Sequence, residues 1–222
     1  METILSVQQP ESLFRTSYTL AIRIWHWLTF LTFTASIVMV LLASTMFTMR
    51  GNIPVVQEQV QQKGGVLSPD QARAVAHEYS DKLWMTHKYI GFGLCFLLLC
   101  RIVIEATYSK ERRLGTKIRK ALTFQTHNDT QRYDRSHYIW VKWGYVIFYL
   151  LFLVMALTGL GLAFEDVPLF RSMHKTLTGI HKVVQFLIYA YIFFHIAGVI
   201  RADVTDNKGI VSRMINGGEK AV

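Results

Sequence analysis

Cysteine is scarce in this 222-residue chain, which contains only Cys95 and Cys100. The two thiols are five residues apart in one apolar segment, so a helix places them on different faces. No CxxC or CxxCH sequence occurs, which argues against a disulfide, a zinc knuckle and a covalently attached c-type haem. We interpret both thiols as structural.

Other common signals are also missing from the sequence. The first twenty residues include the polar stretch "QQPESLFRTSYT", and the first apolar run is too long for the core of a cleavable signal peptide. We therefore expect no cleaved leader. The chain also has no internal repeat and no low-complexity tract.

Long apolar segments are the main feature that is present. The composition is 51% hydrophobic with a mean hydropathy of +0.26. Segments such as "YVIFYLLFLVMALTGLGLAF" have no polar face to present to water, which disfavours a soluble all-α protein. We expect an all-α integral membrane protein, with residues 1–222 forming one membrane domain built on a four-transmembrane-helix bundle. The predicted spans are approximately residues 24–47, 84–106, 139–164 and 177–200.

The net charge of +9 is unevenly distributed. Residues 107–137 carry eight Lys or Arg against three Asp or Glu, whereas residues 48–83 carry four of each. By the positive-inside rule, the 107–137 loop is cytoplasmic, and an even number of spans places both termini on that side. Because the charge lies where topology needs it, we expect contact with lipid headgroups and no nucleic-acid binding.

The loop of residues 48–83 is predicted to lie on the outer side and to contain a short helix. Ser68, Pro69 and Gln71 match the capping box that opens a helix. We expect this helix to cover residues 69–80 and either to contact a partner protein or to cover the outer part of the bundle.

Four histidines sort into two depths under this topology. His26 and His195 lie near the cytoplasmic ends of spans one and four, while His87 and His181 open spans two and four from the outer face. His181 and His195 are fourteen residues apart, so they face similar directions about 21 Å apart along the helix. The third span, residues 139–164, contains no histidine.

Two depth-matched histidine pairs suit two haems. Paired imidazoles in an apolar bundle are the axial ligands of a b-type haem, and two such ligands leave no open iron position, which favours electron transfer. Glycines near the histidines (Gly91, Gly179 and Gly198) would leave room for a porphyrin edge. A proton or metal-ion path would need acidic residues in the spans, and only Glu105 is present there.

The remaining histidines are less suited to haem binding. His174 precedes His181 by seven residues and is an alternative ligand, but it follows a polar turn and is disfavoured by depth. His77, His127 and His137 lie in loops or at loop edges, where we expect them to be solvated.

The sequence resembles the b-type cytochrome subunit of membrane-bound nickel–iron hydrogenases, within the bacterial cytochrome b-561 superfamily. The resemblance covers about residues 14–205, and its most specific parts are "RIWHWL" (23–28) and "HKVVQFLIYAYIFFH" (181–195). In that family, haem ligands come from helices one, two and four. The resemblance therefore implies two b haems whose iron atoms are bound axially by His26, His87, His181 and His195.

The resemblance also implies a function and a location. An outer-facing iron–sulfur or hydrogenase-type oxidoreductase would pass electrons through the haems to menaquinone or ubiquinone in the bacterial cytoplasmic membrane. The chain would then be an electron-transfer subunit and not a catalyst alone. Related subunits serve formate dehydrogenases and thiosulfate reductases, so the donor stays open. The alternatives are a stand-alone cytochrome b561-type quinone reductase and, in a different class, a haem-free transporter lined by histidines.

Four cationic side chains lie near the predicted ligands in the sequence. Arg23 and Arg101 are candidates to pair with haem propionates near the cytoplasmic face. For Arg101, pairing with Glu105 four residues later and snorkelling are equally good explanations. Lys88 and Lys182 each follow a predicted ligand, and for them snorkelling is the default expectation.

Overall fold

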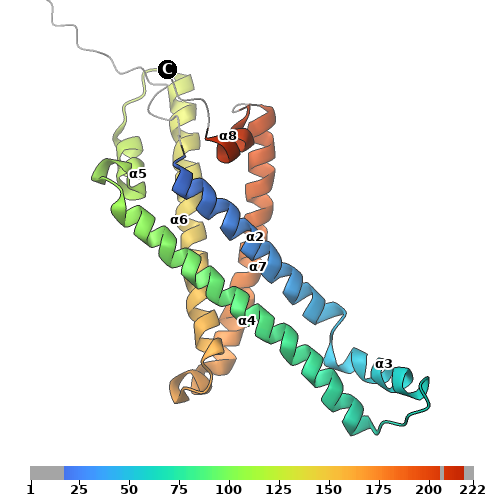
Figure 1. Cartoon of the computed structure of the whole chain (residues 1–222). Helices are drawn as coiled ribbons and strands as arrows, with labels where there is room; N and C mark the ends of the chain where they lie inside the picture. The colour runs from blue at the N-terminus through green and yellow to red at the C-terminus, as the bar shows by residue number, and fades with distance from the viewer. Residues whose placement is uncertain (1–17, 206–207, 218–222) are drawn as a thin grey trace, which may run out of the picture. The chain divides into compact units, whose positions relative to one another are not determined.

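A computed structural model describes residues 18–205 and 208–217 of the chain, and it contains only helices within those residues (Figure 1). The elements in chain order are α2 (Leu20–Thr45), α3 (Met49–Gln61), α4 (Pro69–Thr107), the 3-10 turn η1 (Lys110–Arg112), α5 (Leu114–Thr123), α6 (Asp129–Ala163), α7 (Pro168–Val204) and α8 (Ile210–Asn216).

Four of these helices, α2, α4, α6 and α7, are long and apolar enough to cross a membrane. They coincide with the four predicted spans, so the expected all-helical architecture is confirmed. Three of them are longer than a bilayer requires. The 39 residues of α4 extend about 58 Å, about twice the thickness of a hydrocarbon core of about 30 Å.

The start of α4 is the one predicted from the sequence. The backbone N–H of Gln71 donates to Ser68 Oγ at 3.2 Å, and the N–H of Ser68 donates to Gln71 Oε1 at 2.9 Å. These two bonds are the reciprocal pair of a capping box, and they satisfy N–H groups that the first helical turn leaves open.

The predicted end of this helix at residue 80 is wrong, because α4 continues without a break to Thr107. No glycine or proline occurs between residues 70 and 90. One helical turn apart, His77 Nδ1 lies 2.7 Å from Asp81 Oδ2, and Glu78 forms an ion pair with Lys82. These pairs favour continuation of the helix. The separate short helix of this loop is α3, whose N-terminus is capped by Thr48 Oγ1.

The chain divides into two compact units, and each takes part of all four long helices. The first unit comprises residues 1–25, 99–155 and 180–222, and the second comprises residues 26–98 and 156–179.

Aromatic packing holds the first unit together. The rings of Trp25 and Tyr149 lie 6.2 Å apart, joining α2 to α6, and the rings of Phe148 and Tyr191 stack at 5.1 Å, joining α6 to α7. The side chain of Phe152 is only 1% exposed. Large aromatic contacts of this kind account for much of the packing energy of a bundle.

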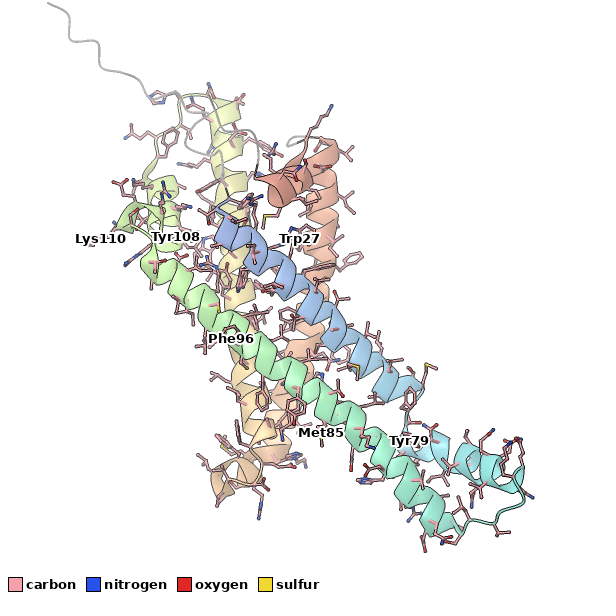
Figure 2. The ribbon with its side chains drawn as sticks, in the orientation of Figure 1. Trp27, Tyr79, Met85, Phe96, Tyr108 and Lys110 are labelled. Carbon is pink, nitrogen blue, oxygen red and sulfur yellow. The ribbon has the colours of Figure 1, made fainter. Side chains whose placement is uncertain are left out.

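Large apolar side chains also remain on the surface of the long helices. On α4, Tyr79, Met85 and Phe96 are 54%, 53% and 64% exposed (Figure 2). An apolar surface continued along four such helices is unfavourable in water but is the surface that lipid tails solvate.

A polar network fixes the end of α4 within the first unit. Arg101 Nη2 pairs with Glu105 Oε2 at 2.9 Å, and Arg101 Nε donates to the hydroxyl of Tyr149 at 2.8 Å. The second oxygen of Glu105 accepts from the backbone N–H of Leu114, at the start of α5. One carboxylate therefore connects α4 to α5 and, through Arg101, to α6.

Replacing this carboxylate should destabilise the protein. In Glu105→Gln the guanidinium of Arg101, 12% exposed, loses its counter-charge, and we expect the free energy of unfolding to fall by about 1–3 kcal/mol. The thermal denaturation midpoint in detergent measures this change. Glu111→Gln, at an exposed site in η1, is the matched control, and equal stability of the two variants would contradict the assignment.

Candidate functional site

The four predicted ligands are divided between the two units. His26 and His87 belong to the second unit, and His181 and His195 belong to the first. Each predicted pair, His26 with His195 and His87 with His181, takes one histidine from each unit. The pairings therefore stay predictions.

His87 is half-buried on α4 and has a partner from another helix. Its Nδ1 lies 3.3 Å from the hydroxyl oxygen of Ser36 on α2. The indole of Trp84 meets the imidazole edge-on, with ring centroids 5.8 Å apart. Ser36 and Trp84 thus restrain the imidazole orientation. Sequence analysis missed Ser36, which lies 51 residues from His87 in the chain.

His26 occupies a half-buried position on α2. Its ring packs edge-on against that of Trp27, with centroids 5.4 Å apart. The neighbouring residues of the same motif belong to the first unit. There Trp25 is buried, and Arg23 donates a 2.6 Å hydrogen bond to the carbonyl oxygen of Ile215 in α8.

His181 and His195 lie on one uninterrupted helix, α7. The fourteen-residue spacing therefore has the helical geometry expected from the sequence. His181 is half-buried, and the ring of His195 stacks on Tyr191, with centroids 6.0 Å apart and planes 7° from parallel. Tyr191 stacks in turn on Phe148 of α6, so the position of His195 depends on contacts with a second helix.

Open space lies beside the predicted ligands. At Gly91, one turn after His87, a Cβ atom would meet no atom of the described chain within 4 Å, and the same holds at Gly198, three residues after His195. Both positions fall on the helix face of their histidine. Gly91 is half-buried and Gly198 is exposed, so no described side chain blocks a flat group such as a porphyrin edge from either backbone position.

The donor chemistry also suits haem better than a bare metal ion. Within the residues that the structure describes, no group of three or more His, Cys, Asp or Glu side chains is placed to hold a metal ion. A metal bound by protein alone needs such a group. Haem brings four equatorial ligands of its own and needs only axial imidazoles. The four histidines thus fit axial ligation.

The cationic candidates have defined surroundings. For Arg101, the predicted pair with Glu105 is confirmed. Arg23 contacts α8 through the carbonyl of Ile215. Lys88 and Lys182 are exposed, as snorkelling side chains would be. A role for any of them at a haem propionate stays a prediction.

His174 lies in the second unit, within the first two turns of α7 and next to the acidic turn that precedes this helix. Its Nε2 is 3.6 Å from a carboxylate oxygen of Glu165, and the two side chains line a shallow open cavity with Asp166 and Arg171. His174 thus follows a polar turn, as the sequence indicates, and lies on the helix that also carries His181. His77, His127 and His137 are all exposed, as expected, but only His127 lies in a loop, because α4 and α6 extend beyond the predicted spans and include His77 and His137.

Lys142 on α6 is a candidate that the sequence analysis overlooked. Its side chain is 4% exposed, and its Nζ lies 4.8 Å and 5.0 Å from the ring centroids of Tyr138 and Tyr145. The available signal was the single charge within the apolar stretch "YIWVKWGYVIF". Its burial among aromatic rings could not be read from that pattern.

Comparison with known protein families gives one family match. The family model described as prokaryotic cytochrome b561 matches residues 17–217. Searches of curated proteins and of solved structures give no match. The family comprises helical membrane bundles that bind b-type haem and transfer electrons, which agrees with the four apolar helices. The match extends over most of the chain, which therefore belongs to the prokaryotic cytochrome b561 family.

Proposed function

We propose that the chain binds two b haems and relays electrons across a bacterial cytoplasmic membrane to quinone. His87 and His181 would ligate the outer haem, and His26 and His195 the cytoplasmic haem. The observation that carries this proposal is the placement of these four imidazoles on α2, α4 and α7, three helices long enough to span, in a chain of a haem-binding family.

The protein's part in this function is to hold and orient the ligands. A bound haem supplies reversible one-electron transfer, and two axial imidazoles leave its iron no position for oxygen. Ser36 and Trp84 restrain His87, Trp27 packs on His26, and Tyr191 stacks on His195. Such outer contacts set ligand orientation and tune the metal.

We further propose that the donor is an outer-facing oxidoreductase of the hydrogenase type. The fifteen residues of α4 before the predicted span at residue 84 extend about 22 Å beyond it. This extension carries exposed charges of both signs, including Asp70, Arg73 and Glu78. Together with α3, it offers a polar surface for a partner protein on the predicted outer side.

Removing the ligands tests the proposal. The purified protein should contain two b haems per chain by pyridine haemochrome assay, and His26→Ala or His87→Ala should reduce this number towards one because each breaks one axial pair. His77→Ala and His174→Ala are matched controls that should keep two haems. Absence of haem from the wild type would refute the proposal, and loss of haem in His174→Ala would move the outer ligand from His181 to His174.

Ser36 should affect only the haem that His87 binds. Ser36→Ala removes the hydrogen bond at His87 Nδ1, and loss of such an outer partner typically weakens metal binding about 10–100-fold. We expect a shifted midpoint potential or lower occupancy for one haem in a redox titration followed by absorbance. Ser44→Ala is the control on the same helix, since Ser44 bonds only to the carbonyl of Leu41 among the described residues. Identical titrations for the two variants would count against His87 as a ligand.

Filling the space beside His87 should exclude haem. Gly91→Leu projects a side chain into the open region one turn from His87, and we expect haem content to fall towards one per chain. Gly144→Leu is the matched control, because Gly144 is also open but lies on α6, which supplies no predicted ligand. Equal haem content in both variants would show that the space beside Gly91 does not hold the porphyrin.

A further inference from the structure

The burial of Lys142 is unusual for its helix. Its neighbours Trp140 and Trp143 are 76% and 46% exposed, whereas Lys142 is 4% exposed. The side chain therefore turns into the first unit and not towards lipid or the aqueous boundary. Snorkelling does not explain it, because a snorkelling lysine keeps its ammonium group exposed.

The charge of Lys142 is poorly compensated. Among the residues described, no carboxylate lies within ion-pair distance of its Nζ. The groups that face it are the rings of Tyr138 and Tyr145 on its own helix and the like charge of Lys117 from α5. Tyr18 interacts with both tyrosines and supplies no carboxylate. Burying an ammonium group in this way is costly, and such residues in membrane proteins mark proton paths.

Lys142 is part of a polar strip on one face of α6. Tyr138, Lys142, Tyr145 and Tyr149 follow at intervals of four, three and four residues, which aligns them along the helix. The strip begins beside the basic 107–137 loop and reaches Tyr149, whose hydroxyl accepts from Arg101. It combines flat aromatic rings with groups that donate hydrogen bonds.

A second donor in the same unit lacks an acceptor. Nη1 of Arg101 is buried and has no hydrogen-bond partner among the described residues. Buried donors are normally satisfied, so each exception calls for an explanation. A quinone head group complements these donors chemically, because it is a flat ring with two carbonyl oxygens that only accept hydrogen bonds.

We propose that quinone binds along this face of α6 and that Lys142 donates a proton to it during reduction. This inference rests on the proposed function, in which electrons from the b haems reach quinone. The quinone takes up two electrons from the haems, one at a time, and two protons, so that each carbonyl oxygen gains an O–H bond. Lys142 gives one proton, becomes a neutral amine and is reprotonated from water on the side of the basic loop. Water on the same side supplies the second proton.

The test uses the purified haem-loaded protein without its partner. The haem is reduced chemically and mixed with a short-chain quinone, and its reoxidation is followed by absorbance. Ferricyanide, which takes one electron and no proton, is the parallel acceptor. Lys142→Arg keeps the charge and the contact with the tyrosine rings but cannot release a proton, since the guanidinium pKa is above 12. Lys142→Met removes the charge, and Lys120→Met, at an exposed site on α5, is the control.

We expect Lys142→Arg and Lys142→Met to slow reoxidation by quinone at least about tenfold, since a general acid typically contributes 10²–10⁴-fold. Both should keep the haem spectrum and the wild-type rate with ferricyanide. A wild-type quinone rate in Lys142→Arg would overturn the inference and leave Lys142 a structural charge. A wild type that ferricyanide reoxidises but quinone does not would refute the quinone step of the proposed function itself.

Discussion

The ion pair of Arg101 and Glu105 lies near one end of a spanning helix, where an uncompensated charge would be costly, and the first unit is organised around it. Glu105 also accepts from the start of α5, and Arg101 also donates to Tyr149 on α6. The guanidinium lies 5.8 Å from the ring centroid of Trp25 on α2. The contacts of this ion pair thus connect α4 to α2, α5 and α6, as expected because buried charges need several partners.

The proposed ligands also need contacts with neighbouring side chains, but fewer than a buried charge does. A neutral imidazole is far less costly to bury than a guanidinium, so one hydrogen bond and an aromatic contact are sufficient to position it. Ser36 and Trp84 provide these contacts for the half-buried His87, whereas His195 is exposed and its ring stacks on Tyr191. The helix without a proposed ligand, α6, supplies packing groups and the polar strip that includes Lys142. Electron transfer and proton delivery would then use different helices of one bundle.

The sequence predicted what depends on local chemistry. Hydropathy located the four spans, the capping box located the start of α4, and the four-residue spacing offered the Arg101–Glu105 pair. The full length of α4 was not predicted from the sequence. No helix-breaking residue immediately follows the predicted end at residue 80, and side-chain contacts one turn apart favour continuation of the helix to Thr107.

Contacts between residues far apart in the chain could not be predicted from the sequence. Tyr149 is 48 residues from Arg101, and Ser36 is 51 residues from His87, so no helical or strand period connects them. Lys142 was visible as a charge in an apolar stretch, but its orientation depends on packing around α6. The assignment of histidines to pairs depends on depth in the membrane, which is inferred from charge and hydropathy and remains a prediction.

The central claim is that one chain holds two haems, each with two axial imidazoles. Low-temperature electron paramagnetic resonance of the oxidised, purified protein tests it directly, because spin state reports the number of strong axial ligands and integration counts the centres. The account predicts two low-spin ferric haems per chain and no high-spin signal. A single centre, or a dominant high-spin signal from iron with an open axial position, would contradict it.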